Sequence, residues 1–112
     1  MKEVAKGDVW LTNLPGGEGH EQKGRKYAAV LRDIKQMNMA VVVPLTSKPK
    51  TENYPYTHLF MPSKENGLWD ETFAMVFQIV SLDKSGLLQK AGKLDAKDIA
   101  AIDSILKDML KL

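Results

Sequence analysis

MAVVVPLTS, residues 39–47, is the stretch that decides the fold. It is rich in β-branched side chains, which favour strands, and it is apolar at successive positions, so both of its faces should be buried. A strand of this kind lies in the middle of a sheet, with other structure on both sides. Pro44 has no N–H group to give to a ladder, which predicts that it lies at a strand end or at a bulge.

Four stretches on either side of this segment also have strand patterns. In the first, Val9 and Leu11 share one face, and residues 15–19, rich in Pro and Gly, end the strand. The last is long and reads as one extended strand. The four stretches are DVWLTNL (8–14), YAAVLRDI (27–34), YTHLFMP (56–62) and TFAMVFQIVSLD (72–83).

The C-terminal stretch, LDAKDIAAIDSILKDMLKL (94–112), has the period of a helix. Asp95 is suited to cap its N-terminus, and Asp98 is suited to its first turn. Strands followed by one terminal helix predict a mainly β (α+β) fold, in which a strongly curved antiparallel sheet forms a small barrel and the helix packs on it. The apolar stripe that should pack on the sheet comprises Leu94, Ile99, Ile102, Ile105, Leu106, Met109 and Leu110.

Composition excludes several kinds of site. The chain has 112 residues, no cysteine and two histidines far apart in sequence, so we expect one domain over residues 1–112, no disulfide framework and no metal site. The longest apolar run is too short to cross a bilayer, and no signal peptide is visible. The sequence therefore predicts a cytoplasmic protein that does not associate with a membrane. A net charge of +2 is too small to indicate nucleic-acid binding by electrostatics alone.

The cations are instead concentrated in one segment, GGEGHEQKGRKYAAVLRD (16–33), which holds both arginines and one of the two histidines. Four motifs occur in order along the chain: KGDVWLTNL (6–14), GHEQKG (19–24), VVVPLTS (41–47) and FQIVSLDKSGL (77–87). In sequence, order and spacing they resemble the MazF/PemK family of toxin ribonucleases from bacterial toxin–antitoxin pairs. The resemblance covers roughly residues 6–110.

The resemblance implies a fold, an activity and partners. The fold would be an SH3-like barrel, and the protein would be a homodimer with a groove spanning the two copies. The activity would be metal-independent, sequence-specific cleavage of single-stranded RNA without a cofactor. A cognate antitoxin would block the groove with its C-terminal segment.

The residues supply the groups that this chemistry needs. When the neighbouring 2′-OH attacks the phosphate, the enzyme must provide a proton acceptor, a proton donor and a cation for the developing charge. The candidate catalytic residues are Lys26, Arg25, His20, Glu21 and Thr46. The candidate RNA-binding residues are Gln22, Lys23, Gly24, Ser47, Lys48 and Gln78.

The chain departs from the family at the arginine–proline pair of this loop. If GHEQKG sets the register, Lys26 takes the arginine position and Tyr27 the proline position. Lys26 keeps the charge but loses the planar fork that binds a phosphate with two hydrogen bonds. Arg25 is one residue early, and neighbouring side chains of an extended strand point to opposite faces. Which of Arg25 and Lys26 faces the site stays open.

This departure leaves a second function open. A MazF-like protein with weakened or absent catalysis could act by binding, either docking an antitoxin or engaging a protein target as CcdB-type gyrase poisons do. It could also bind RNA without cutting it. The missing arginine favours these alternatives, whereas His20, Glu21 and Thr46 favour the nuclease.

Overall fold

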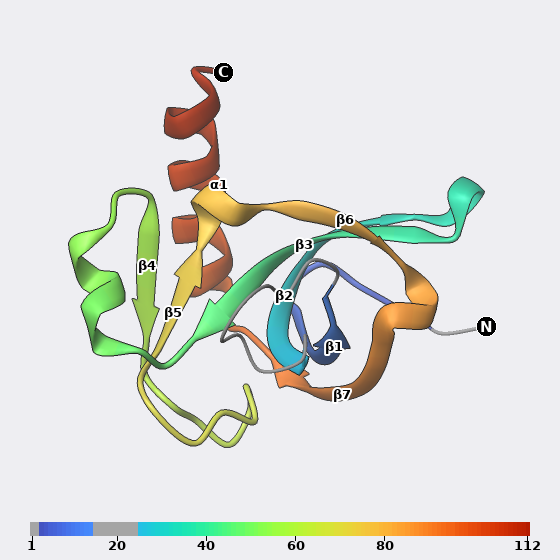
Figure 1. Cartoon of the computed structure of the whole chain (residues 1–112), viewed down its shortest axis with the longest axis horizontal. Helices are drawn as coiled ribbons and strands as arrows, with labels where there is room; N and C mark the ends of the chain where they lie inside the picture. Colours follow the sequence, from blue (N-terminus) through green and yellow to red (C-terminus); the bar gives the residue numbers. More distant parts are fainter. Residues whose placement is uncertain (1–2, 15–24) are drawn as a thin grey trace.

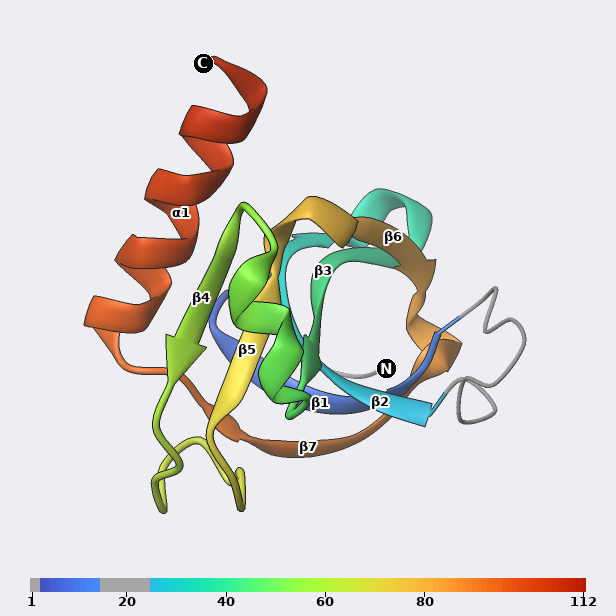
Figure 2. The same ribbon diagram turned by 60° about the vertical axis from the view of Figure 1, so that its left-hand side comes forward.

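A computed structural model describes residues 3–14 and 25–112 and shows one strongly curved antiparallel sheet with a helix packed against it (Figures 1 and 2). The sheet order is β4-β5-β3-β2-β1-β7, and β6 pairs with β3. The strands are β1 (Asp8–Asn13), β2 (Arg25–Ile34), β3 (Met39–Thr46), β4 (Thr57–Phe60), β5 (Thr72–Met75), β6 (Val80–Asp83) and β7 (Leu87–Lys93). Short 3-10 turns are η1 (Lys35–Met37), η2 (Pro49–Asn53), η3 (Val76–Gln78) and η4 (Lys84–Gly86), and the helix is α1 (Ala96–Leu110).

Two apolar cores lie on opposite faces of the central strands. The barrel core comprises Trp10, Ala28, Val30, Ala40, Val42, Leu82 and Leu87. The helix-side core comprises Val9, Ala29, Val43, Leu45, Phe60, Leu68, Ala74, Val76, Leu94 and Ile102. Along β3, Val42 enters the barrel core and Val43 enters the helix-side core. This alternation confirms that residues 39–46 form a central strand covered on both faces.

Pro44 lies inside β3 rather than at its end, next to a bulge, which is the second of the two places predicted for it. On one edge of β3, β6 pairs as far as Val42 and β5 begins at Leu45. Val43 and Pro44 therefore lie opposite the five residues 75–79, which include η3. A proline can occupy this interruption without losing a ladder bond on that edge.

The same interruption corrects the prediction of one extended strand over residues 72–83. The stretch is two strands, β5 and β6, separated by η3. A second correction is β7, which the sequence pattern did not indicate. It pairs with β1 through a register that shifts twice, between Val9 and Trp10 and between Leu11 and Thr12.

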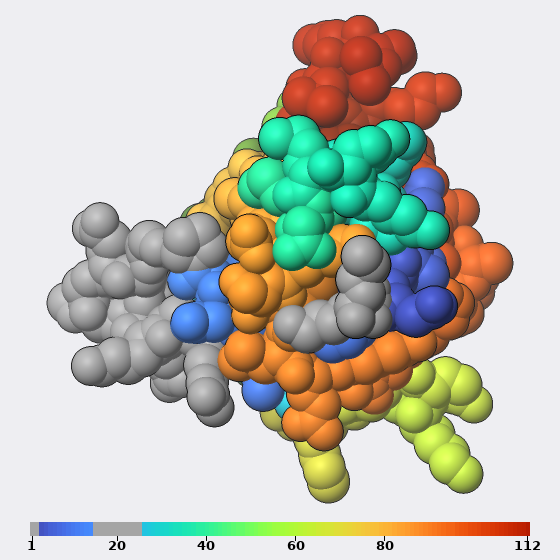
Figure 3. All heavy atoms as spheres, turned by 90° about the vertical axis from the view of Figure 1, so that its right-hand side faces the viewer, coloured from blue at the N-terminus to red at the C-terminus, as the bar shows by residue number. Residues whose placement is uncertain are grey.

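An ion pair and a backbone hydrogen bond join η4 to the β2–β3 hairpin. Among the described strands no ladder joins β6 to β7, so the barrel is open there. Lys84 in η4 is buried and pairs with Asp33 of β2, and the Lys84 amide donates to the Asn38 carbonyl at 3.0 Å. Figure 3 shows the β2–β3 turn, coloured green-blue, lying directly against the orange segment that contains η4.

The helix begins and packs as predicted, with one exception at its end. The Asp95 side chain caps α1 by accepting from the Asp98 amide at 2.8 Å. Ile102 is buried in the helix-side core, and Ile99, Ile105, Leu106 and Met109 pack against it in part. Leu110 is 51% exposed and does not belong to the core, because the last turns of α1 extend beyond the sheet (Figures 1 and 2).

Candidate functional site

Part of the predicted site falls outside the described residues. His20, Glu21, Gln22, Lys23 and Gly24 all belong to residues 15–24. Arg25 is the first residue of β2, and only its backbone is among the described parts of the chain. The part of the site that the structure does place comprises Lys26, Thr46, Ser47, Lys48 and Gln78.

Lys26 is fixed to the strand beside it at the point where the loop rejoins the sheet. It is the second residue of β2, pairs with Thr12 of β1 and is half-buried. The buried Thr12 hydroxyl donates to the Lys26 carbonyl at 2.7 Å. Because the β1–β2 register is regular here, Lys26 shares a face with Ala28, whose side chain enters the barrel core.

Thr46 is the last residue of β3. The β2–β3 ladder ends with Ala28 opposite Pro44, and beyond it Leu45 and Thr46 pair with Ala74 and Phe73 of β5. The Thr46 hydroxyl accepts a hydrogen bond from the Lys48 amide at 3.3 Å, which turns the chain at the strand end. Lys26 and Thr46 therefore each lie two residues beyond the last pair of the β2–β3 ladder, and Thr46 belongs to the part of β3 that pairs with β5.

Three predicted RNA-binding residues surround this end of β3. Ser47 and Lys48 are exposed and follow the strand directly. Gln78 is exposed in η3, inside the bulge opposite Pro44, on the edge of β3 away from β2. Gln78 therefore lies beside the C-terminal half of β3, whereas Lys26 pairs with β1.

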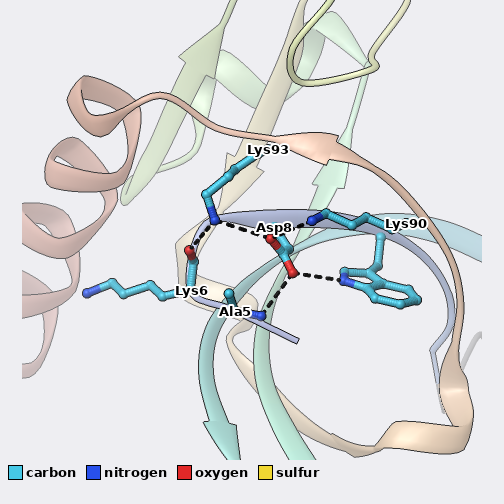
Figure 4. A network of polar contacts seen from close by, with 6 residues as sticks. Ala5, Lys6, Asp8, Lys90 and Lys93 are labelled. Carbon is cyan, nitrogen blue, oxygen red and sulfur yellow. Dashed lines mark hydrogen bonds and ion pairs between the residues drawn. The ribbon is translucent and has the colours of Figure 1, made fainter. Parts of the chain in front are cut away.

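The most densely bonded carboxylate belongs to the start of β1. Asp8 is buried; its Oδ2 accepts from the Ala5 amide at 2.9 Å and from Trp10 Nε1 at 3.4 Å (Figure 4). Its Oδ1 lies 3.3 Å from the ammonium groups of Lys90 and Lys93. Burial raises the pKa of Asp8, but these hydrogen bonds and cations outweigh it and leave the pKa below its ordinary value. The network ties β1 to β7 and is structural.

Gly7, just before Asp8, explains why the motif needs a glycine. Its φ of +92° is a left-handed conformation, and a Cβ there would lie 2.5 Å from Ile99 Cδ1 of α1. Its amide donates to the Val30 carbonyl and its carbonyl accepts from the Leu94 amide, both at 2.8 Å. The Gly-Asp pair therefore joins the start of β1 to β2 and to the helix.

A histidine–aspartate pair outside the motifs also has a structural place. His58 Nε2 of β4 lies 2.9 Å from Asp98 Oδ1 at the start of α1. The pair connects the edge strand to the helix, and its ring packs edge-to-face on Phe60. No sequence pattern indicates this pair, because 40 residues separate the partners.

Over residues 3–14 and 25–112, no group of three His, Cys, Asp or Glu side chains is arranged to hold a metal ion. No helix in this part of the chain is long and apolar enough to cross a membrane. The placed site residues offer a cation, hydroxyls and an amide, which are groups that hold phosphate oxygens and base edges.

The sequence matches the family described as "PemK-like, MazF-like toxin of type II toxin-antitoxin system" over residues 5–110. It is 29% identical over 112 residues to endoribonuclease EndoA of Bacillus subtilis (strain 168), covering 97% of this chain and 96% of that protein.

The fold is similar to that of solved toxins. The crystal structure of MazF from Deinococcus radiodurans has a TM-score of 0.74 and 26% identity, with 99% of this chain and 100% of that chain covered. An endoribonuclease in complex with its cognate antitoxin from a mycobacterial species has a TM-score of 0.76 and 19% identity, with 98% and 97% covered. The second likeness concerns the fold alone.

Proposed function

Because the chain belongs to the PemK-like, MazF-like toxin family of type II toxin–antitoxin systems, we propose that it is an endoribonuclease toxin that cleaves single-stranded RNA at a short sequence. The observation that carries the proposal is the match to this family over residues 5–110, a range that includes the loop motif and Lys26. The similarity to EndoA supports the same activity. The toxin acts in the cytoplasm and needs neither a metal ion nor a cofactor.

The reaction is a transfer within the RNA backbone. The 2′-oxygen forms a bond to phosphorus, the bond from phosphorus to the 5′-oxygen breaks, and a 2′,3′-cyclic phosphate and a 5′-hydroxyl result. One group takes the proton of the 2′-OH and another gives a proton to the leaving oxygen. We assign these proton transfers to His20 and Glu21 of the loop.

Lys26 stabilises the charge that develops on the phosphate oxygens, and Thr46 holds a phosphate oxygen through its hydroxyl. Gln22, Lys23, Gly24, Ser47, Lys48 and Gln78 bind the RNA on either side of the cut. Arg25 binds phosphates more generally, so Arg25→Ala should weaken RNA binding and lower its salt dependence more than it slows the cleavage step.

One incubation distinguishes RNA cleavage from RNA binding without cleavage. Purified protein is mixed with a long single-stranded RNA in EDTA, and the RNA is followed by denaturing and native gels. Discrete fragments support the metal-independent nuclease. Intact RNA of shifted mobility supports RNA binding without cleavage, and intact, unshifted RNA contradicts both.

A second candidate function rests on a specific observation at this site. A lysine stands where the family has its arginine, and Tyr27, in the proline position, packs partly against the helix-side core. A toxin relative with weakened catalysis would then act by docking an antitoxin or another protein. Restoration of cleavage by Lys26→Arg in a protein that is otherwise inactive identifies this case.

We further propose that the protein is a homodimer that a cognate antitoxin binds and neutralises. Leu110 at the end of α1 and Leu112 two residues after it are exposed, and η3, which contacts α1, exposes Phe77. Exposed apolar side chains grouped on one side of a small protein are typical of an interface. Equilibrium sedimentation at micromolar concentration should show the dimer mass, and a monomer alone contradicts this assembly.

A further inference from the structure

We propose that Thr12 is a positioning residue for the cleavage reaction: its hydroxyl holds the backbone of Lys26 so that the lysine ammonium is ready to meet the scissile phosphate. The inference rests on the proposed function, because it assigns Thr12 a role through Lys26. No motif of the sequence marks Thr12 as anything but a strand residue.

The first observation is that the Thr12 hydroxyl is wholly buried and is bonded to the backbone of Lys26. Thr12 has no exposed surface, and its Oγ1 donates to the Lys26 carbonyl at 2.7 Å. Thr12 and Lys26 are already paired in the β1–β2 ladder, and the side-chain hydrogen bond adds a second link between the same two residues. Strand ends open most readily, and Lys26 is the second residue of β2, directly after the loop.

The second observation is that Thr12 is itself held firmly. On the edge of β1 away from β2 it pairs with Leu87, which has no exposed surface. Gly86 packs so closely that a Cβ added there would lie 3.3 Å from the Asn13 carbonyl and 2.7 Å from Leu82 Cδ1. Thr12 is therefore held in one position by its packing, and its hydrogen bond restrains the backbone of Lys26.

The chemistry explains why such a bond matters for a lysine. An arginine fork meets a phosphate with two hydrogen bonds and so fixes its own orientation, whereas an ammonium on a flexible stem does not. A displacement of about 1 Å at a reacting group lowers a rate by about 100-fold. A fixed backbone limits where the Lys26 ammonium can lie and compensates in part for the missing fork.

The experiment compares Thr12→Val with a matched control in single-turnover cleavage of one defined RNA. Thr72→Val is the control, because Thr72 is also a buried threonine whose Oγ1 donates to a backbone carbonyl, that of Asp70, at 2.9 Å. We expect Thr12→Val to slow the cleavage step by roughly 10-fold or more with the RNA dissociation constant changed less than about 2-fold. Thr12→Ser should restore the rate, and Thr72→Val should leave it unchanged.

Amide hydrogen exchange of residues 25–27 gives a readout that does not depend on activity. Thr12→Val should speed exchange there by about 10-fold or more, and Thr72→Val should not. Equal loss of cleavage in both valine variants, an unchanged rate in Thr12→Val, or unchanged exchange would each overturn the proposal. A wild-type protein that cuts no RNA contradicts the proposed function, and the exchange measurement then still decides whether Thr12 fixes Lys26.

Discussion

Replacing Asp8 by alanine should destabilise the protein by about 1.5–6 kcal/mol. The Ala5 amide loses a charged acceptor at 2.9 Å, a bond that contributes about 1.5–3 kcal/mol. The 3.4 Å bond from Trp10 is long and contributes under about 1 kcal/mol. Lys90 and Lys93 have side chains 49% and 53% exposed, so each ion pair contributes about 0–1 kcal/mol.

The assay is urea unfolding of Asp8→Ala beside Asp103→Ala. Asp103 also pairs with a lysine, Lys6 at 2.7 Å, but both side chains are about half exposed, so its loss should change the free energy of unfolding by less than about 1 kcal/mol. The slope of the unfolding free energy against urea should be the same for both variants. Equal destabilisation by the two substitutions would refute the reasoning, because burial would then not distinguish them.

The lowered pKa of Asp8 adds a pH dependence of known sign. A carboxyl whose pKa is lower in the folded state stabilises the fold above its unfolded pKa, about 3.9, and this contribution is lost as the pH falls through the folded value. Asp8→Asn removes the titrating group. The free energy of unfolding should therefore decline less between about pH 5 and pH 2 in Asp8→Asn than in the wild type, and parallel declines would contradict this.

Two further predictions concern the packing of α1 and the ion pair of η4. Ile102→Ala should lower the free energy of unfolding by about 2–5 kcal/mol because Ile102 is buried, whereas Leu110→Ala should change it by less than about 0.5 kcal/mol; similar urea midpoints would contradict the placement of the helix. Lys84→Ala should cost about 3–5 kcal/mol because it leaves Asp33 buried without its cation, and the double variant with Asp33→Ala should recover part of that loss; no recovery would mean that the ion pair is not the cause.

The sequence predicted the elements whose structure depends on local patterns of their own side chains. Residues 39–46 alternate between two cores, so their apolar pattern predicts a central strand. Asp95 and the apolar period after it predict α1, because capping and helix spacing are local. Leu110 was assigned to the core wrongly, since periodicity continues past the point where the sheet ends.

Long-range partners explain what the sequence did not predict. Residues 72–83 are mostly apolar and have no break in their strand pattern, and only the pairing with β3 on both sides of Pro44 divides them into β5 and β6. Strand β7 has three exposed residues in succession, 88–90, and owes its place to β1. At the candidate site, motifs indicated Lys26 and Thr46 separately, while the partners of these residues, Thr12 of β1 and Phe73 of β5, depend on the sheet order.

The measurement that tests the central claim most directly is single-turnover cleavage of one RNA in EDTA by the wild type and by Lys26→Ala. Lys64→Ala, at an exposed lysine of the β4–β5 loop, is the control. We expect the wild type and the control to cut at the same sites and rates, Lys26→Ala to be slower by about 100-fold or more, and Lys26→Arg to equal or exceed the wild type. Normal cleavage by Lys26→Ala together with an inactive Arg25→Ala would contradict the account, because Arg25 would then be the catalytic cation.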